Sequence, residues 1–153
     1  MSANPPASLR ERVVRMLHRE IDAILAPAGY VQAGGRWSRT TAFARTWVEI
    51  QRSSSGLACY LNLGRLQRLL NWEWVPPGTY FSGWRIGDFA DSTAEHNSLD
   101  ALAYDQLDGD SPLRAKVMAL LSERALPFLK ASHTPFGYRM LPPRLAALRE
   151  ARP

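Results

Sequence analysis

Cysteine is nearly absent from this sequence. The 153 residues include one cysteine, Cys59. A single thiol excludes an internal disulfide framework and a cysteine-based zinc site. Cys59 alternates with Leu57 and Leu61 in an apolar strand pattern, which predicts a buried thiol of low reactivity.

Long apolar runs are also missing. No run approaches the ~20 apolar residues that a membrane-spanning helix needs. The first residues, Met1 to Pro6, lack the apolar core of a signal peptide. We therefore expect a cytoplasmic protein that does not enter a membrane.

The familiar catalytic signatures are absent as well. There is no glycine-rich phosphate loop, no G-x-S-x-G nucleophile elbow and no H-E-x-x-H metal motif. His18 and Glu20 imitate the first half of the zinc-deaminase signature, but the P-C-x-x-C half is missing. Asp105, Asp108 and Asp110 do not have EF-hand spacing, which favours loop and cap roles. We expect no catalytic residue, metal or cofactor, and an enzyme is the less favoured class.

What is present is typical of a folded domain. Hydrophobic residues make up 46% of the chain and charged residues 22%, ordinary values for a globular protein. The length corresponds to about one domain. We expect a single domain over residues 8–132, followed by a Pro- and Arg-rich tail over residues 133–153 that is at most partly ordered.

Apolar periodicity predicts one helix, a group of strands and then further helices. Leu9 to Leu25 has helical spacing and follows an S-x-x-E capping box that begins at Ser8. Strands placed between helices indicate an α+β fold, with an antiparallel sheet of four to five strands, one preceding helix and C-terminal helices packing on one face. The expected strands are 30–33, 36–43, 45–52, 57–63 and 83–89, and the later helices are 99–107 and one from Pro112 that Pro127 kinks or divides.

Five short segments, taken in order, resemble a known family. They are Gly29-Tyr30, Val48 to Ser53, Tyr60 to Gly64, Trp84 to Gly87 and Ala125 to Leu129. In this order they resemble the bacterial DUF4304 family, a domain of unknown function, over roughly residues 9–131. The resemblance implies an α+β fold of this arrangement, and it implies no activity, cofactor or catalytic residue.

Charge is distributed unevenly along the chain. Residues 1–72 carry a net charge of +6, residues 73–113 carry −7 and residues 114–153 carry +6. The acidic segment either pairs with its basic flanks or forms an exposed face that attracts a basic partner. The acidic candidates for partner binding are Asp88, Asp91, Glu95, Asp100, Asp105, Asp108 and Asp110.

An aromatic loop lies directly before the acidic residues Asp88 to Asp110. Tryptophan and tyrosine are common anchors in protein interfaces, and the alternative is a loop that folds back over the core. The aromatic candidates are Trp72, Trp74, Tyr80 and Trp84. Our leading hypothesis is a small binding protein with a protein partner, and a bacterial immunity or inhibitor protein is one concrete version of it.

Two other hypotheses come from the strands. Single-stranded nucleic acid is bound by aromatic side chains that stack on its bases and by cations that contact its backbone. Trp37 shares a strand face with Arg39, and Trp47 shares one with Arg45 and Gln51. The alternative is that helices cover this face and the tryptophans are core. Polar residues on adjacent strands suit a small-ligand pocket or a hydrogen-bond ladder. The nucleic-acid candidates are Arg36, Trp37, Arg39, Arg45 and Trp47, and the pocket candidates are Gln51, Asn62 and Arg85.

Overall fold

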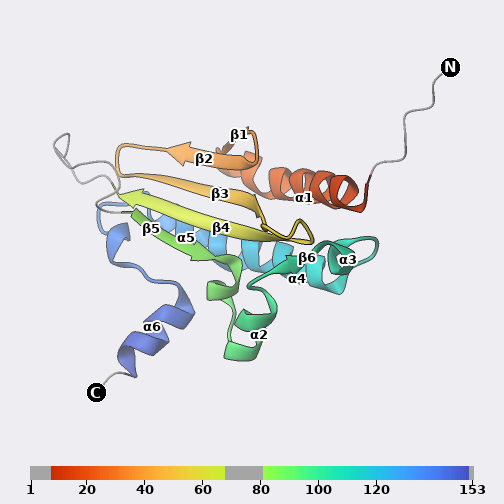
Figure 1. The fold of residues 1–153 in the computed structure, drawn as a ribbon. Helices are drawn as coiled ribbons and strands as arrows, with labels where there is room; N and C mark the ends of the chain where they lie inside the picture. The colour runs from red at the N-terminus through yellow and green to blue at the C-terminus, as the bar shows by residue number, and fades with distance from the viewer. Residues whose placement is uncertain (1–7, 68–80, 152–153) are drawn as a thin grey trace.

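An antiparallel sheet with helices on one side forms the molecule (Figure 1). The computed structural model describes residues 8–67 and 81–151. Strands β1 to β5 lie in chain order, every neighbouring pair is antiparallel, and β6 pairs with β4. The predicted α+β fold with an antiparallel sheet is therefore confirmed. The strands are β1 (Val31–Ala33), β2 (Arg36–Thr40), β3 (Ala44–Arg52), β4 (Ala58–Gln67), β5 (Phe81–Arg85) and β6 (Leu102–Ala103).

The helices come before the sheet and after it. Figure 1 shows α1, α4 and α5 together on one side of the strands. Within residues 8–67 and 81–151, no helix has the length and apolarity that crossing a bilayer requires. The helical elements are α1 (Leu9–Leu25), η1 (Ala26–Ala28), η2 (Ile86–Phe89), α2 (Thr93–Ser98), α3 (Tyr104–Leu107), α4 (Pro112–Leu120), η3 (Leu121–Ala125), α5 (Leu126–Ala131), η4 (Gly137–Arg139) and α6 (Pro143–Glu150).

Helix α1 begins and ends where its sequence signals predict. The Ser8 side chain accepts the Glu11 backbone N–H, and the Glu11 carboxylate accepts the Ser8 N–H, which completes the capping box. At the other end Gly29 has a φ of 86°, a left-handed conformation that glycine adopts without strain. The buried residues recur every four positions and face the sheet: Val13, Leu17, Ile21 and Leu25.

The core lies between the sheet and these helices. Strand residues alternate between the two faces, so Trp37, Val48 and Leu63 point toward the helices and are at most 1% exposed. Cys59 is buried among them as predicted, and burial raises the pKa of its thiol to about 11. Leu57 differs from the prediction: it precedes β4 and is 74% exposed.

The chain after β5 folds differently from the prediction. Residues 83–89 do not form one strand, because the Asp88 side chain accepts the Arg85 backbone N–H at 2.9 Å and turns the chain into η2. Residues 99–107 do not form one helix either. Ser92 caps the earlier helix α2 instead, and the chain then pairs β6 with β4 before the single turn of α3.

Pro127 divides the long C-terminal helix as predicted. Between α4 and α5 lies η3, a five-residue π-helical stretch in which the Leu126 N–H bonds to the Leu121 carbonyl. Proline lacks an amide and clashes one turn back, so the widened turn accommodates it.

The C-terminal segment contacts the domain and contains a further helix. Arg65, only 4% exposed, donates to the carbonyl oxygens of Gly137 at 2.7 Å and Met140 at 3.2 Å. Beyond this contact the chain forms α6, which contacts η2. Residues 133–151 thus pack against the domain in the part that the structure describes.

Candidate functional site

The face of the sheet away from α1, α4 and α5 carries polar and half-exposed side chains. On β3 the residues that alternate with the buried ones are Arg45, Trp47, Glu49 and Gln51. These side chains are exposed or half-buried, whereas Ala44, Thr46 and Val48 are fully buried. We call this surface the open face.

Strand register places four polar residues in one row across the open face. Arg36 lies opposite Glu49, Glu49 opposite Asn62, and Asn62 opposite Arg85. Neighbouring strands are ~4.8 Å apart, so the row spans about 14 Å. The Arg36 guanidinium contacts the Glu49 carboxylate at 3.0 Å, and the Asn62 side-chain amide donates to Gln51 at 2.6 Å. We call this row the polar ladder.

A row of small residues next to the polar ladder supports one tryptophan. Trp47 lies opposite Gly64, which in turn lies opposite Gly83. A Cβ atom on Gly64 would come within 2.2 Å of the Trp47 ring, so the indole lies directly over this glycine. The Arg36 guanidinium carbon lies 5.4 Å from the centre of the same ring, within cation–π range. Trp47 thus forms a half-buried aromatic surface beside the ladder.

Residues of η2, α2 and the chain after α2 border the ladder on one side. One Asp88 carboxylate oxygen lies 3.4 Å from His96 Nδ1, a nitrogen that is fully buried. The Arg85 guanidinium contacts Asp100 at 2.5 Å and lies over the Tyr60 ring at 4.1 Å. Together these groups enclose a cleft of about 510 Å³. Its lining residues are Arg36, Trp47, Glu49, Asn62, Leu63, Gly83, Trp84, Arg85, Asp88, His96 and Asp100.

Charge in the cleft is mixed, with a negative excess. The lining contains two guanidinium groups and three carboxylates. With His96 neutral, the formal charge of the lining is therefore −1. Each guanidinium is paired with one carboxylate, Arg36 with Glu49 and Arg85 with Asp100. Asp88 instead contacts a backbone N–H and an imidazole.

Comparisons with known proteins identify no family for this chain. No family model, curated protein or solved structure matches the chain. The resemblance to the DUF4304 family therefore stays a prediction.

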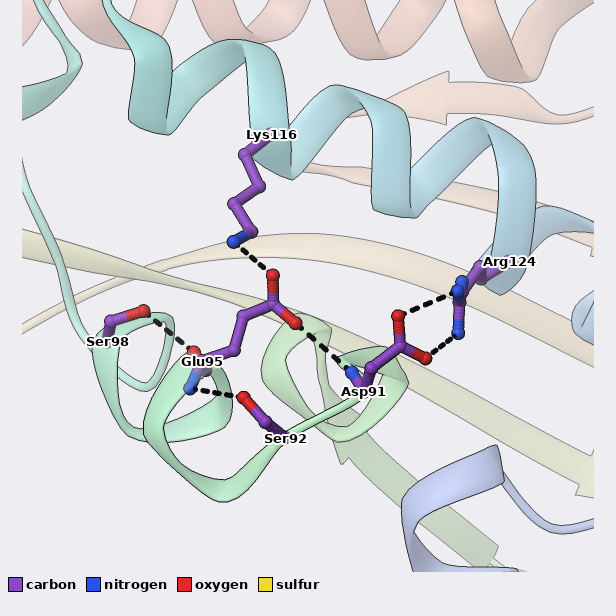
Figure 2. A network of polar contacts seen from close by, with 6 residues as sticks. All are labelled: Asp91, Ser92, Glu95, Ser98, Lys116 and Arg124. Carbon is purple, nitrogen blue, oxygen red and sulfur yellow. Dashed lines mark hydrogen bonds and ion pairs between the residues drawn. The ribbon is translucent and has the colours of Figure 1, made fainter.

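Three residues of the acidic segment, Asp91, Glu95 and Asp108, pair with its basic flanks. Figure 2 shows Lys116 and Arg124 reaching Glu95 and Asp91 from the long C-terminal helix. Asp108 pairs with Arg12 of α1 at 2.8 Å. Hydrogen bonds from Lys116 and Arg12 hold the pKa values of Glu95 and Asp108 below their ordinary values. Asp105 and Asp110 are exposed but lie outside the cleft lining, which takes only Asp88 and Asp100 from this segment.

Trp84 is the member of the aromatic loop that lies within the described residues. Trp72, Trp74 and Tyr80 lie outside the described residues. Trp84 is 7% exposed, and its ring meets the Phe128 ring edge-on at 5.0 Å. The prediction of Trp84 as an exposed anchor is wrong, because its position opposite Leu63 turns it toward the helices.

The predicted nucleic-acid face is split between the two sides of the sheet. Trp37 is fully buried on the helix side, and Arg39 shares that side. Arg36, Arg45 and Trp47 lie on the open face. The five residues therefore do not form one stacking platform, and Trp37 is unable to stack on a base.

The pocket candidates are the ones that the structure brings together. Asn62 and Arg85 line the cleft, and Gln51 is bonded to Asn62. Sequence reasoning did not connect them with Trp47 and His96. The pairing of β3 with β4 would have indicated that Trp47 lies on the same face as Asn62. His96 reaches the cleft only through the folding of η2 and α2, which the sequence did not predict.

The other two histidines, His18 and His133, contact residues on the helix side of the sheet. His133 contacts the Thr41 and Thr46 hydroxyls at 2.6 and 2.8 Å, and burial lowers its pKa. The His18 ring packs against Trp37. Over residues 8–67 and 81–151, no three His, Cys, Asp or Glu side chains gather in a way that could hold a metal ion.

Proposed function

We propose that this chain is a binding protein that docks onto a protein partner through the open face, with the cleft at the centre of the interface. One observation carries the proposal: Trp47 lies half-buried over Gly64 and is bordered by the charged ladder and a cleft of about 510 Å³. Interfaces commonly place an aromatic residue at the centre and polar groups at the rim.

A protein partner fits this surface better than a small molecule does. Small-molecule sites are mostly apolar and bury most of their ligand. Here the charged groups of the ladder remain partly in solvent, with Arg36 and Arg85 side chains 43% and 39% exposed. An immunity or inhibitor protein is the concrete form that we propose, since such a protein acts by occupying its partner's surface and needs no chemistry of its own.

Removing the Trp47 side chain should weaken partner binding strongly. The partner is first isolated from native cells at low salt and identified, and its affinity for purified variants is then measured by calorimetry. Interface hot spots contribute about 2 kcal/mol or more, so Trp47→Ala should raise Kd about 30-fold. Circular dichroism verifies that the variant is folded.

Asp105→Asn is the matched control. Asp105 is exposed, belongs to the acidic segment and lies outside the cleft. We expect its Kd to stay within about twofold of wild type, as for most surface positions away from an interface centre. Unchanged affinity for Trp47→Ala, or a large loss for Asp105→Asn, would move the interface away from the open face.

A second candidate function is a small-ligand site or an enzyme. The observation that favours it is the 3.4 Å approach of Asp88 to the buried His96 Nδ1, which has no hydrogen-bond partner among the described residues. A carboxylate next to an imidazole is a common acid–base combination. The same isolation from native cells separates the candidates. A small molecule that accompanies the wild type but not His96→Gln would favour this one, and nucleic acid released by salt would favour a role for Arg36, Arg45 and Trp47 in binding it.

A further inference from the structure

We propose that the group entering the cleft is the guanidinium of an arginine on the partner. This inference rests on the proposed function and names the chemistry of the partner at that site. It follows from two arginine sites that the chain itself builds on the open face.

The chain's own arginines show what the surface accepts. Arg36 lies over the Trp47 ring and contacts Glu49 with one nitrogen. Arg85 lies over the Tyr60 ring and contacts Asp100 with one nitrogen. Both sites combine an aromatic face with a carboxylate at its edge. A planar guanidinium stacks on such a ring and donates to the acid at the same time.

Charge complementarity points to a cation as the guest. The three carboxylates of the cleft exceed its two guanidinium groups by one, and within the described residues the Asp88 carboxylate forms no ion pair with a guanidinium or ammonium group. An incoming carboxylate or phosphate would meet this negative excess, whereas an incoming cation neutralises it. Arginine fits better than lysine because its planar fork can stack and form paired hydrogen bonds, while an ammonium is a compact and strongly hydrated charge.

The test uses a small probe and the intact protein. N-acetyl-arginine methylamide, with N-acetyl-glutamate methylamide as the anionic counterpart, is titrated into ¹⁵N-labelled protein. Binding is followed by NMR at the Trp47 indole N–H and at the amides of Gly64 and Gly83. We expect the arginine probe to shift these signals with a saturable dependence and the glutamate probe to leave them in place.

The variant Arg36→Ala gives the sharpest outcome. It removes the chain's own guanidinium from Trp47 and Glu49 and makes the lining more negative. The arginine probe should therefore bind about two- to fivefold more tightly, the range expected for one exposed charge pair. Glu49→Gln should weaken binding by a similar factor. Arg52→Ala is the control: it removes the same charge at an exposed position outside the cleft, and the probe's Kd should not change.

Three results would overturn the inference. They are no saturable shift with the arginine probe in either wild type or Arg36→Ala, weaker binding of that probe to Arg36→Ala, and tighter binding of the glutamate probe than of the arginine probe. None of these results contradicts the proposed function, which is tested separately by the effect of Trp47→Ala on the partner's Kd. If that variant has no effect while the arginine probe still binds, the docking proposal fails and the arginine site stands alone.

Discussion

Replacing Trp37 with alanine is expected to cost about 3–5 kcal/mol of unfolding free energy. Trp37 is fully buried and is among the largest side chains enclosed in the core. Its indole N–H donates to Asp22 at 3.1 Å, and the His18 ring packs against it. Alanine removes this contact area and leaves a cavity between α1 and the sheet. Because whole domains are stable by roughly 5–15 kcal/mol, this loss is large.

Denaturant unfolding followed by far-UV circular dichroism measures the loss. Trp37→Phe is the graded control, since it retains a ring in the core and loses only the indole's extra volume and its N–H. The unfolding free energy of Trp37→Phe should therefore lie between those of wild type and Trp37→Ala. A loss below about 1 kcal/mol for Trp37→Ala would mean that the indole is not a core residue. In that case the hypothesis of nucleic acid stacking on Trp37 would have to be reconsidered.

Arg65→Ala is expected to destabilise the protein by about 3 kcal/mol and to loosen its C-terminal segment. The guanidinium is nearly buried, bonds to two backbone carbonyls of residues 137–140, and lies 5.0 Å from the Trp84 ring centre. Burial lowers the pKa of Arg65. Hydrogen bonds to charged groups contribute about 1.5–3 kcal/mol each, and without Arg65 the Gly137 carbonyl keeps the Met140 N–H as a donor but loses the charged one.

Hydrogen exchange followed by mass spectrometry separates the local effect from the global one. In Arg65→Ala the amides of residues 137–150 should exchange faster by a larger factor than those of β3. Arg65→Met is the control, because it retains much of the packing against Trp84 but none of the hydrogen bonds. It should loosen the C-terminal segment and lose less stability than alanine. Unchanged exchange in this segment for both variants would contradict the role given to Arg65.

The sequence was most informative where one residue decides a local structure. The capping box of Ser8 and Glu11 marks the start of α1, and Gly29 follows its end. Pro127 follows a π-helical stretch in the C-terminal helix. Each of these signals acts through backbone hydrogen bonds or backbone conformation. Alternation of apolar residues likewise located the strands, because a sheet with one covered face requires a period of two.

Sequence reasoning failed after β5, where two short-range side-chain caps were missed, and in the acidic segment, where contacts distant in the chain decide the outcome. Residues 86–89 leave the strand because Asp88 bonds to the Arg85 backbone, and α2 precedes the predicted helix because Ser92 caps it. Asp91 and Asp108 form ion pairs that depend on the fold. Their partners Arg124 and Arg12 lie 33 and 96 positions away in the chain.

The candidate site was predictable only in part. Gln51, Asn62 and Arg85 were expected to lie together, and the structure joins Asn62 and Arg85 in the cleft lining. Their combination with Trp47 depended on strand register, which places Trp47 opposite Gly64. A shift of the β3 register by one residue would have turned Trp47 toward the core, because successive strand residues face opposite sides of the sheet.

The most direct test of the binding site is hydroxyl-radical footprinting of the protein with and without its isolated partner. The method reports side-chain accessibility, and Trp47 and Tyr60 are both half-buried on the open face. Phe136, which is 68% exposed in the C-terminal segment, serves as the internal reference. We predict that the partner slows oxidation of Trp47 and Tyr60 and leaves Phe136 unchanged. Unchanged oxidation of Trp47 together with protection of Phe136 would contradict docking on the open face.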